Sequence, residues 1–184
     1  MNAERFGDCW SGSDPRALTR FELNLMPMDL IVNWRRCSMT SDWIGRYIAL
    51  EFPQEDHAFR EISTVVNELL ENLVKFAVNK RESVKLTVTN FGDFVRIDAT
   101  NKCRDVHVQP LRDGFLKLLD SNPEELFLTR VEEAADADSS GSGLGLIALA
   151  KDHCSGLGLE VPAAGEGEFL VTVRAELSTE EMED

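Results

Sequence analysis

The chain lacks the cysteine and histidine spacings that mark a zinc site or a disulfide framework. It has four cysteines, no CxxC pair occurs, and no histidine stands at metal-ligand spacing from any of them. We therefore expect reduced thiols in a cytoplasmic protein. The cysteines are Cys9, Cys37, Cys103 and Cys154.

Positive charge is also scarce. Lys and Arg number 19 against 33 Asp and Glu, which gives a formal net charge of −14. The densest basic cluster is the pair Arg35-Arg36. A phosphate backbone would meet repulsion from such a chain, so we expect no nucleic-acid partner.

Long apolar runs are missing as well. The N-terminus has no basic segment followed by an apolar stretch, and the oily stretch nearest to it, residues 23 to 32, is interrupted by Pro27 and Asp29. We therefore expect neither a secretion signal nor a membrane segment, and a cytoplasmic location.

What remains has the composition of a globular domain, with 43% hydrophobic and 28% charged residues. Shifts in pattern along the chain predict four parts: a loose arm over 1–20, a strand and helix extension over 21–56, the main domain over 57–177 and an acidic, frayed tail over 178–184.

Periodicity predicts the elements. Alternating apolar residues indicate strands over 21–25, 84–88, 95–99, 157–161 and 169–177, with a turn at 90–93. Helices are expected from a cap at Thr40 or Ser41 to Leu50, then over 57–79, 111–119, 123–133 with Asn122 as N-cap, and 144–153.

The helix over 57–79 carries the most informative pattern. At about 100° per residue, Glu68, Asn72, Lys75 and Asn79 lie beside a broad apolar arc, while Asn67 and Glu71 point further round toward water. An Asn oxygen suits Mg²⁺, and a carboxylate one turn away suits a general base. Taken alone, these four polar residues, which we call the polar stripe, also fit the solvated face of an ordinary amphipathic helix. The arc contains Ile62, Val65, Val66, Leu69, Leu70, Leu73, Phe76 and Ala77.

A second motif, Gly141-Ser142-Gly143-Leu144-Gly145-Leu146, follows a small, acidic segment and begins an apolar helix. Backbone N–H groups free of side chains at a helix N-terminus favour a bound phosphate. The motif is neither a P-loop nor a dinucleotide fingerprint, because it lacks the Lys-Ser/Thr pair and the preceding strand. A flexible linker is the alternative interpretation.

Together and in this order, the two motifs resemble the GHKL (histidine-kinase-like, Bergerat) ATPase superfamily. Residues 67–77 look like its N box and 141–146 like its second glycine box, and the resemblance covers about 59–177. It implies an α+β two-layer sandwich, with a mixed, mostly antiparallel sheet, helices on one face, and a nucleotide lid over roughly 128–142.

The resemblance also implies roles and cofactors, namely ATP and Mg²⁺. It makes Glu68 the general base and Asn72 the Mg²⁺ ligand, and it places Lys75 on phosphate. Where the family has an Asp-x-Gly-x-Gly box, this chain has residues 101–105, which contain no glycine. By the resemblance, Asn101 would accept a hydrogen bond from the adenine amino group, and Lys102 and Arg104 would contact phosphate. The phosphate-wrapping turn would comprise Gly141, Ser142, Gly143, Leu144 and Gly145.

The three histidines, His57, His107 and His153, do not lie in a dimerisation hairpin of the histidine-kinase kind. The pattern is therefore most similar to stand-alone anti-sigma-factor-like serine/threonine kinases of bacterial partner switching, including the SiaB-like group. We expect a kinase that phosphorylates or binds a small regulatory protein. The segment 21–52, with Trp34 and Trp43, would bind that partner or a second copy in a homodimer. The alternative is a degenerate GHKL-fold interaction module without nucleotide turnover.

Overall fold

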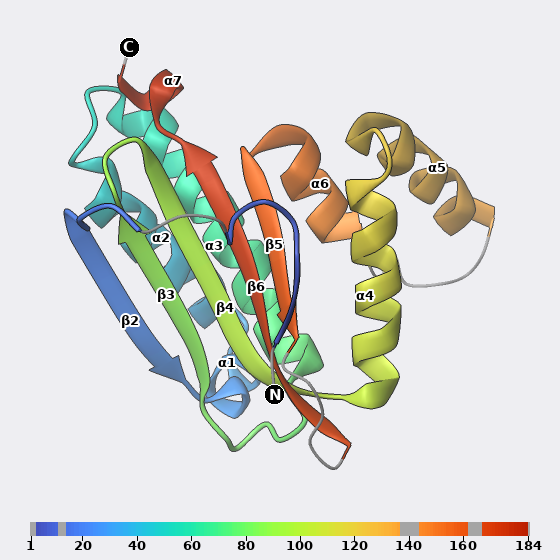
Figure 1. The fold of residues 1–184 in the computed structure, drawn as a ribbon. Helices are drawn as coiled ribbons and strands as arrows, with labels where there is room; N and C mark the ends of the chain where they lie inside the picture. The colour runs from blue at the N-terminus through green and yellow to red at the C-terminus, as the bar shows by residue number, and fades with distance from the viewer. Residues whose placement is uncertain (1–2, 11–13, 137–143, 162–166, 184) are drawn as a thin grey trace.

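Six strands form one antiparallel sheet in the computed structural model, which describes residues 3–10, 14–136, 144–161 and 167–183 (Figure 1). The strand order is β1-β5-β6-β4-β3-β2, so β1 and β2 form the two edges. The strands are β1 (Glu4–Phe6), β2 (Thr19–Leu25), β3 (Val84–Asn90), β4 (Phe94–Arg104), β5 (Gly156–Val161) and β6 (Glu168–Ser178).

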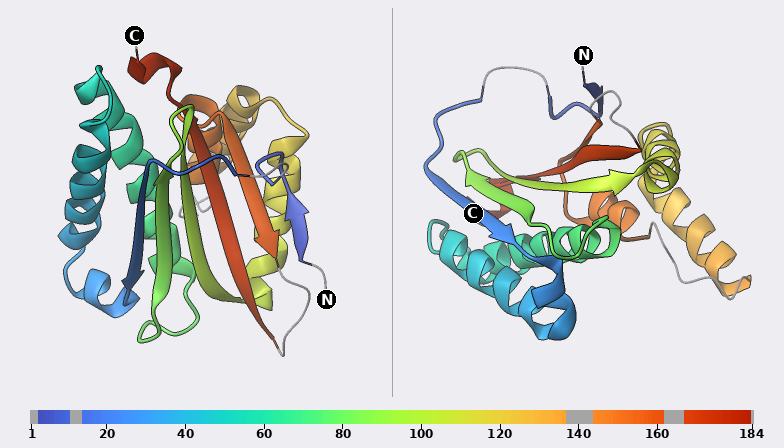
Figure 2. Two further views of the ribbon diagram at one scale, coloured as in Figure 1. Left: turned by 60° about the vertical axis from the view of Figure 1, so that its left-hand side comes forward. Right: turned by 90° about the horizontal axis from the view of Figure 1, so that it is seen from below.

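Helices α1, α2, α3 and α6 lie on one side of the sheet, and α4 stands at its β5 side with α5 beyond (Figures 1 and 2). This arrangement confirms the expected α+β sandwich with helices on one face. No helix in the described part of the chain is long and apolar enough to cross a membrane. The helices are α1 (Pro27–Val32), α2 (Arg35–Ala49), α3 (Glu55–Phe76), α4 (Asp105–Leu119), α5 (Pro123–Asp136), α6 (Leu144–Asp152) and α7 (Glu180–Glu183).

Helix α3 is the centre of the core. Its predicted apolar arc is buried from Ile62 through Ala77, with Leu69 at 0% exposure, and only Phe76 is partly exposed. The arc packs against the inward side chains of β3, β4 and β6, such as Leu86 and Ile97. The 3.6-residue periodicity therefore predicted the buried face correctly.

The β3–β4 hairpin forms at the predicted turn. Phe91 N–H donates to the Phe94 carbonyl at 3.0 Å, and Asn90 Oδ1 accepts from Gly92 N–H at 2.8 Å. Gly92 has φ +95°, a conformation that favours glycine. Side-chain capping of α5 also occurs as expected, because Asn122 Oδ1 accepts from Glu124 N–H at 2.9 Å.

Two helices begin five or more residues earlier than predicted. Helix α2 starts at Arg35, and its N-terminus has no side-chain cap, so the expected caps Thr40 and Ser41 lie inside it. Helix α4 starts at Asp105 and contains Pro110 in its interior. Proline removes one backbone donor and usually marks a helix end, which is why the pattern indicated a start only after it.

Residues 4–6 are not part of a loose arm, because they form β1 and pair with β5 at Glu4↔Val161. The C-terminal tail also differs from the frayed segment expected. Met182 is 2% exposed, and its carbonyl accepts from Gln54 N–H at 3.0 Å. Both segments are too short for a periodic signal, and tertiary contacts alone order them.

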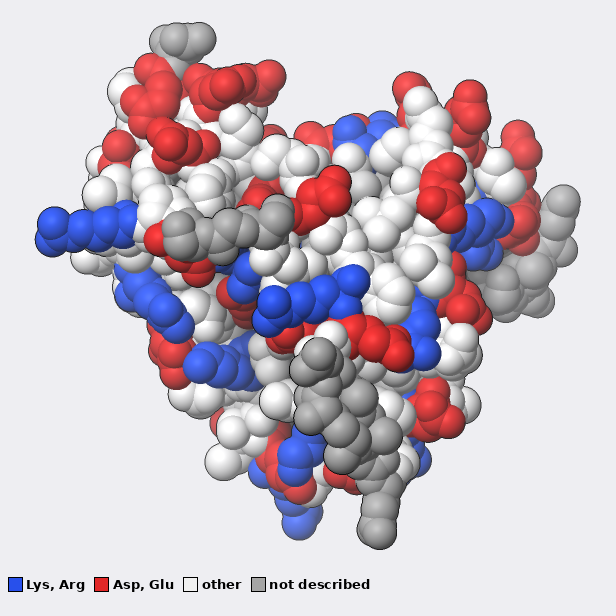
Figure 3. Space-filling view, viewed as in Figure 1, with Lys and Arg blue, Asp and Glu red and all other residues white. Residues whose placement is uncertain are grey.

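The other face of the sheet carries ionic contacts and the described residues between β1 and β2, which are 7–10 and 14–18 (Figure 2). The Arg174 guanidinium makes a two-pronged contact with the Asp98 carboxylate at 2.7 and 3.2 Å and lies 4.2 Å from the centroid of the Trp10 ring. Arg174 also donates to the Cys9 carbonyl at 3.0 Å. Lys and Arg lie across the middle of this face, and Asp and Glu gather at the rims near α7 and α5 (Figure 3).

Shortening Leu69 to Ala should destabilise the protein by about 2 to 5 kcal/mol, because the side chain is fully buried at the centre of α3. Thr64→Ala, on the exposed side of the same helix, is the control and should change the free energy of unfolding by less than about 0.5 kcal/mol. Urea unfolding followed by circular dichroism measures both. Equal effects would show that α3 is not the core helix.

Candidate functional site

A cavity of about 320 Å³ lies where α3 faces α4, α5 and α6; we call it the α4-side cavity. Its polar wall is the stripe of α3, and its apolar floor comes from β4 and β6 together with α4. The cavity is thus lined by both charged and apolar side chains. Its lining includes Glu68, Asn72, Lys75, Asn101, His107, Arg130 and Gly145, and the apolar Leu69, Leu73, Phe76, Ala99, Phe115 and Val171.

The first two polar residues of the stripe contact each other. Asn72 Nδ2 donates to Glu68 Oε1 at 3.1 Å. Because the amide nitrogen faces the carboxylate, the Asn72 oxygen is directed away from it. The pair thus has one carboxylate and one amide oxygen on neighbouring helical turns, the hard donors that Mg²⁺ accepts alongside water. In the described residues, no group of three or more His, Cys, Asp or Glu could form an all-protein metal site.

The third component, Gly145, comes from the first turn of α6. A Cβ built on Gly145 would overlap the Glu68 carboxylate, so a larger residue there would require the end of the Glu68 side chain to move. Leu144 begins α6 and is half-buried. The expected phosphate-turn residues Gly141, Ser142 and Gly143, and part of the expected lid, lie outside the described residues. The remainder of that lid belongs to α5.

Burial raises the pKa of the Glu68 carboxyl above its ordinary value. The hydrogen bond from Asn72 opposes this shift, the negative charge of Glu71 adds to it, and the positive charge of Lys75 opposes it. Glu68 is therefore a stronger base than an exposed glutamate. Such a shift inside a cavity is typical of a functional carboxylate.

The ammonium groups of Lys75 and Lys80 have different surroundings. Lys75 is exposed, lines the cavity, and places its ammonium 5.3 Å from the centroid of the Phe76 ring. The Lys80 ammonium donates to three carbonyls at the end of α3, those of Val74, Ala77 and Lys75, at 2.5, 2.9 and 3.0 Å. Lys80 therefore caps the helix, a role that the sequence pattern did not indicate.

Asn101 also lines the cavity and is buried within β4. Its amide donates to the Leu73 carbonyl at 3.4 Å, and its oxygen accepts from the Cys103 thiol at 3.4 Å. Strand pairing continues without a break to Arg104↔Glu168. The backbone therefore makes no glycine turn at the point where the family has its first glycine box.

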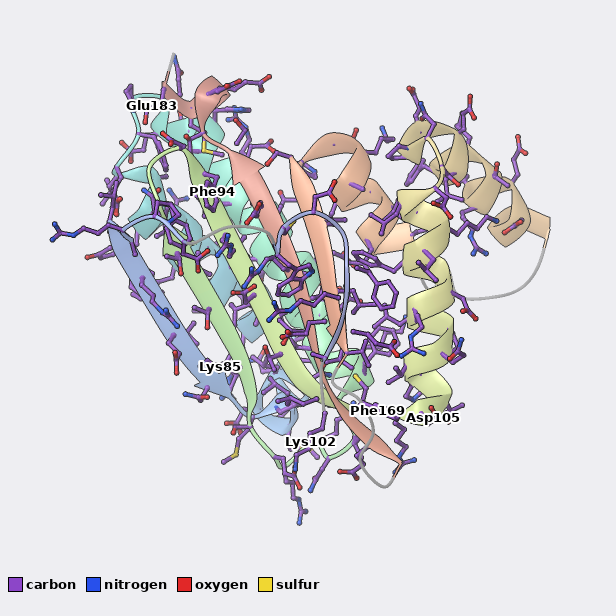
Figure 4. The ribbon with its side chains drawn as sticks, in the orientation of Figure 1. Lys85, Phe94, Lys102, Asp105, Phe169 and Glu183 are labelled. Carbon is purple, nitrogen blue, oxygen red and sulfur yellow. The ribbon has the colours of Figure 1, made fainter. Side chains whose placement is uncertain are left out.

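Lys102 and Arg104 do not line the α4-side cavity. Lys102 is exposed and pairs with Glu82 at 3.1 Å, at the end of β4 near Asp105 and Phe169 (Figure 4). Successive strand residues point to opposite faces, so Asn101 and Cys103 face the helices and these two cations do not. Phosphate contact by Lys102 or Arg104 is therefore not supported.

Asn67 and Glu71 also differ from expectation, since neither is fully exposed to water. Asn67 Nδ2 donates to Glu71 Oε1 at 2.8 Å, and the Asn67 oxygen is buried without a partner. Sequence analysis also missed His107, Lys117 and Arg130, which line the cavity from α4 and α5. No local signal marks them, because their place depends on how those helices dock.

No protein-family model matches the sequence, and no curated protein matches it. The fold is similar to that of a chain in the crystal structure of the SiaB–SiaC complex from Pseudomonas aeruginosa. The two chains share 17% sequence identity with a TM-score of 0.63, and the match covers 88% of this chain and 91% of the other. At this identity the likeness establishes the fold.

Replacing Glu68 by Gln should stabilise the fold more at neutral than at acid pH. Because the folded-state pKa lies above the unfolded one, the folded state holds this proton more tightly, and the ionised carboxylate costs stability above the folded pKa. Below the unfolded pKa both states are protonated and the cost vanishes. The difference in Tm between Glu68→Gln and wild type should therefore increase from about pH 4 to about pH 8 in thermal unfolding.

The control for this measurement is Glu132→Gln, which removes a charge from an exposed position on α5. A difference in Tm that decreases with rising pH at Glu68, or that follows the control, would contradict burial as the cause of the shift.

Proposed function

We propose that this protein is a Mg²⁺-dependent, ATP-binding regulator of the GHKL type that transfers the γ-phosphoryl group to a serine or threonine of a small partner protein. One observation carries the proposal: Glu68, Asn72 and Gly145, from two motifs far apart in the sequence, meet at one cavity. In an ordinary amphipathic helix, nothing requires a carboxylate of the polar face to contact a glycine at the start of another helix.

In this proposal each residue has one role. Asn72 would hold Mg²⁺ through its amide oxygen, and bound Mg²⁺ supplies neutralisation of phosphate charge. Glu68 would take the proton of the attacking hydroxyl, for which its raised pKa is suited. Lys75 and the backbone at Gly145 would bind phosphate oxygens at the positive end of α6.

The structural likeness supports a partner protein and a place in bacterial signalling by partner switching, because the similar chain was crystallised within a complex of two proteins. The match covers 88% of this chain and 91% of the other, so the likeness is one of the whole fold and is not confined to a short motif.

The surface proposed for that partner, or for a second copy, is the aromatic face of β2 and α2. The Phe21 ring lies edge-on to the rings of Trp43 and Tyr47, with centroids 5.3 and 4.8 Å apart. Trp43 is 51% exposed, and β2 is an edge strand. Exposed aromatics beside an open strand edge are typical of an interaction surface.

A second candidate function is an interaction module that binds a partner without turning over nucleotide. The unbroken pairing of β4 through Arg104 favours it, because Asn101 already bonds to Leu73 and Cys103. Partner binding that ignores ATP, ADP and Glu68→Ala would support this candidate.

Calorimetric titration with Mg·ATP should show binding to the wild type and a loss in Asn72→Ala of about tenfold or more, equal to about 1.4 kcal/mol. The amide oxygen is the only metal donor that this substitution removes. Gln109→Ala, on the exposed side of α4, is the control and should bind as wild type. Absence of binding to the wild type would reject the proposal.

Glu68→Gln should separate binding from chemistry. The substitution keeps the size of the side chain and removes the base. Affinity for Mg·ATP should therefore stay within about threefold of wild type, while the rate of ATP hydrolysis falls by about 100-fold. Slow hydrolysis, in which water is the acceptor, needs no partner protein and is measured over hours with a phosphate sensor. Equal rates in the two proteins would remove Glu68 from the role of base.

A further inference from the structure

A second cavity, of about 500 Å³, opens on the other side of the same stripe; we call it the α1-side cavity. It shares Glu68, Asn72, Lys75 and Gly145 with the α4-side cavity. The rest of its wall comes from α1, from the residue before α2 and from the end of α3. These additional residues are Ile31, Trp34, Glu71, Val74 and Lys80.

The two cavities differ in chemistry. Apolar side chains line most of the α4-side cavity, and such a lining suits a flat heterocyclic base. The α1-side cavity has two exposed apolar side chains at its rim, Ile31 at 44% and Trp34 at 48% exposure. Of the four shared residues, Asn72, Lys75 and Gly145 are those proposed to hold Mg²⁺ and phosphate, and Glu68 is the proposed base, so a γ-phosphate would lie at the junction of the cavities.

Phosphoryl transfer places the attacking and leaving oxygens on opposite sides of the phosphorus, roughly in line. If the nucleotide approaches the junction from the α4-side cavity, the hydroxyl must approach from the other side. We infer that the α1-side cavity receives the phosphate acceptor, a Ser or Thr on an extended partner segment with an apolar side chain beside it. This inference rests on the proposed function.

The step balances without any additional reactant. The hydroxyl O–H bond breaks and its proton goes to Glu68, the oxygen forms a bond to the γ-phosphorus, and the bond to the bridging oxygen breaks with its electron pair leaving on ADP. Glu68 lines both cavities, so it can reach a hydroxyl in the α1-side cavity.

Trp34 is the specificity-determining residue in this arrangement. The backbone around it is fixed, because Leu30 and Cys37 are buried against Val74 and Met28 N–H donates to the Lys80 carbonyl at 2.8 Å. The Lys80 ammonium already bonds three carbonyls, so the rim recognises the acceptor through apolar contact. A rigid aromatic at a cavity rim is a typical anchor for a neighbouring apolar side chain.

Two cysteine probes test the division of the cavities without a partner. Ile31→Cys lies at the rim of the α1-side cavity, and Val106→Cys, at a position 68% exposed, lies at the rim of the α4-side cavity. Saturating Mg·ADP should slow maleimide labelling of Val106→Cys by about tenfold and of Ile31→Cys by less than about twofold. Wild-type protein corrects for labelling of the native thiols.

Protection of Ile31→Cys by Mg·ADP would overturn the inference, because the nucleotide would then fill the α1-side cavity. If calorimetry shows no Mg·ADP or Mg·ATP binding at all, the proposed function fails. The two failures are therefore distinguishable.

Transfer itself is tested with labelled ATP and a positional-scanning library of peptides that each carry one Ser or Thr. Trp34→Ala should bind Mg·ATP within about twofold of wild type, transfer about tenfold less phosphate and lose the preference for an apolar neighbour. Leu170→Ala, which shortens an exposed apolar side chain of β6 that lines neither cavity, should behave as wild type. Equal transfer by Trp34→Ala, or ATP binding without any labelled peptide in the wild type, would overturn the inference.

Discussion

Burial of one face of α3 against the sheet is the constraint on which the site depends. The helix cannot turn about its axis without exposing Leu69 and Leu73 or burying the charge of Glu68. The position of Glu68 and Asn72 at the boundary between core and cavity is therefore set by hydrophobic packing. Chemistry and stability depend on the same helix, and the polar stripe is only as rigid as the apolar arc beside it.

Contacts at the C-terminal end of α3 and in the first turn of α6 complete the site. The first turn of α6 meets the Glu68 carboxylate at Gly145. The Lys80 ammonium caps α3, and its carbonyl accepts from α1 at Met28. Lys80 therefore couples the wall of the α1-side cavity to the helix that carries Glu68. These contacts fix the distance between the two sides of the proposed transfer site.

Sequence patterns predicted the parts of this structure that rest on local periodicity. The apolar arc of α3, the turn at Gly92 and the cap at Asn122 all follow from residue spacing and turn chemistry. The start of α2, the extension of α4 through Pro110 and strand β1 depend on contacts with distant segments, so no local pattern indicated them. In the site, the N-box stripe was readable because one helix carries it. The contributions of His107 and Arg130 come from docked neighbours and became visible only in three dimensions, as did the place of Trp34, expected in a partner surface, at the rim of the α1-side cavity.

The first strand has a consequence for how the chain folds as it is made. Arg5 of β1 pairs with Glu160 of β5, 155 residues further on, whereas β2, next in the chain, lies at the opposite edge of the sheet. During synthesis β1 must therefore wait for its partner until β5 has left the ribosome. Until then the Trp10 ring has neither Arg174 nor the β5 backbone at Gly158 to pack against. Closure of this segment over the sheet is expected to be a late, non-local event, and the least protected intermediate would be a sheet that still has β5 as an open edge.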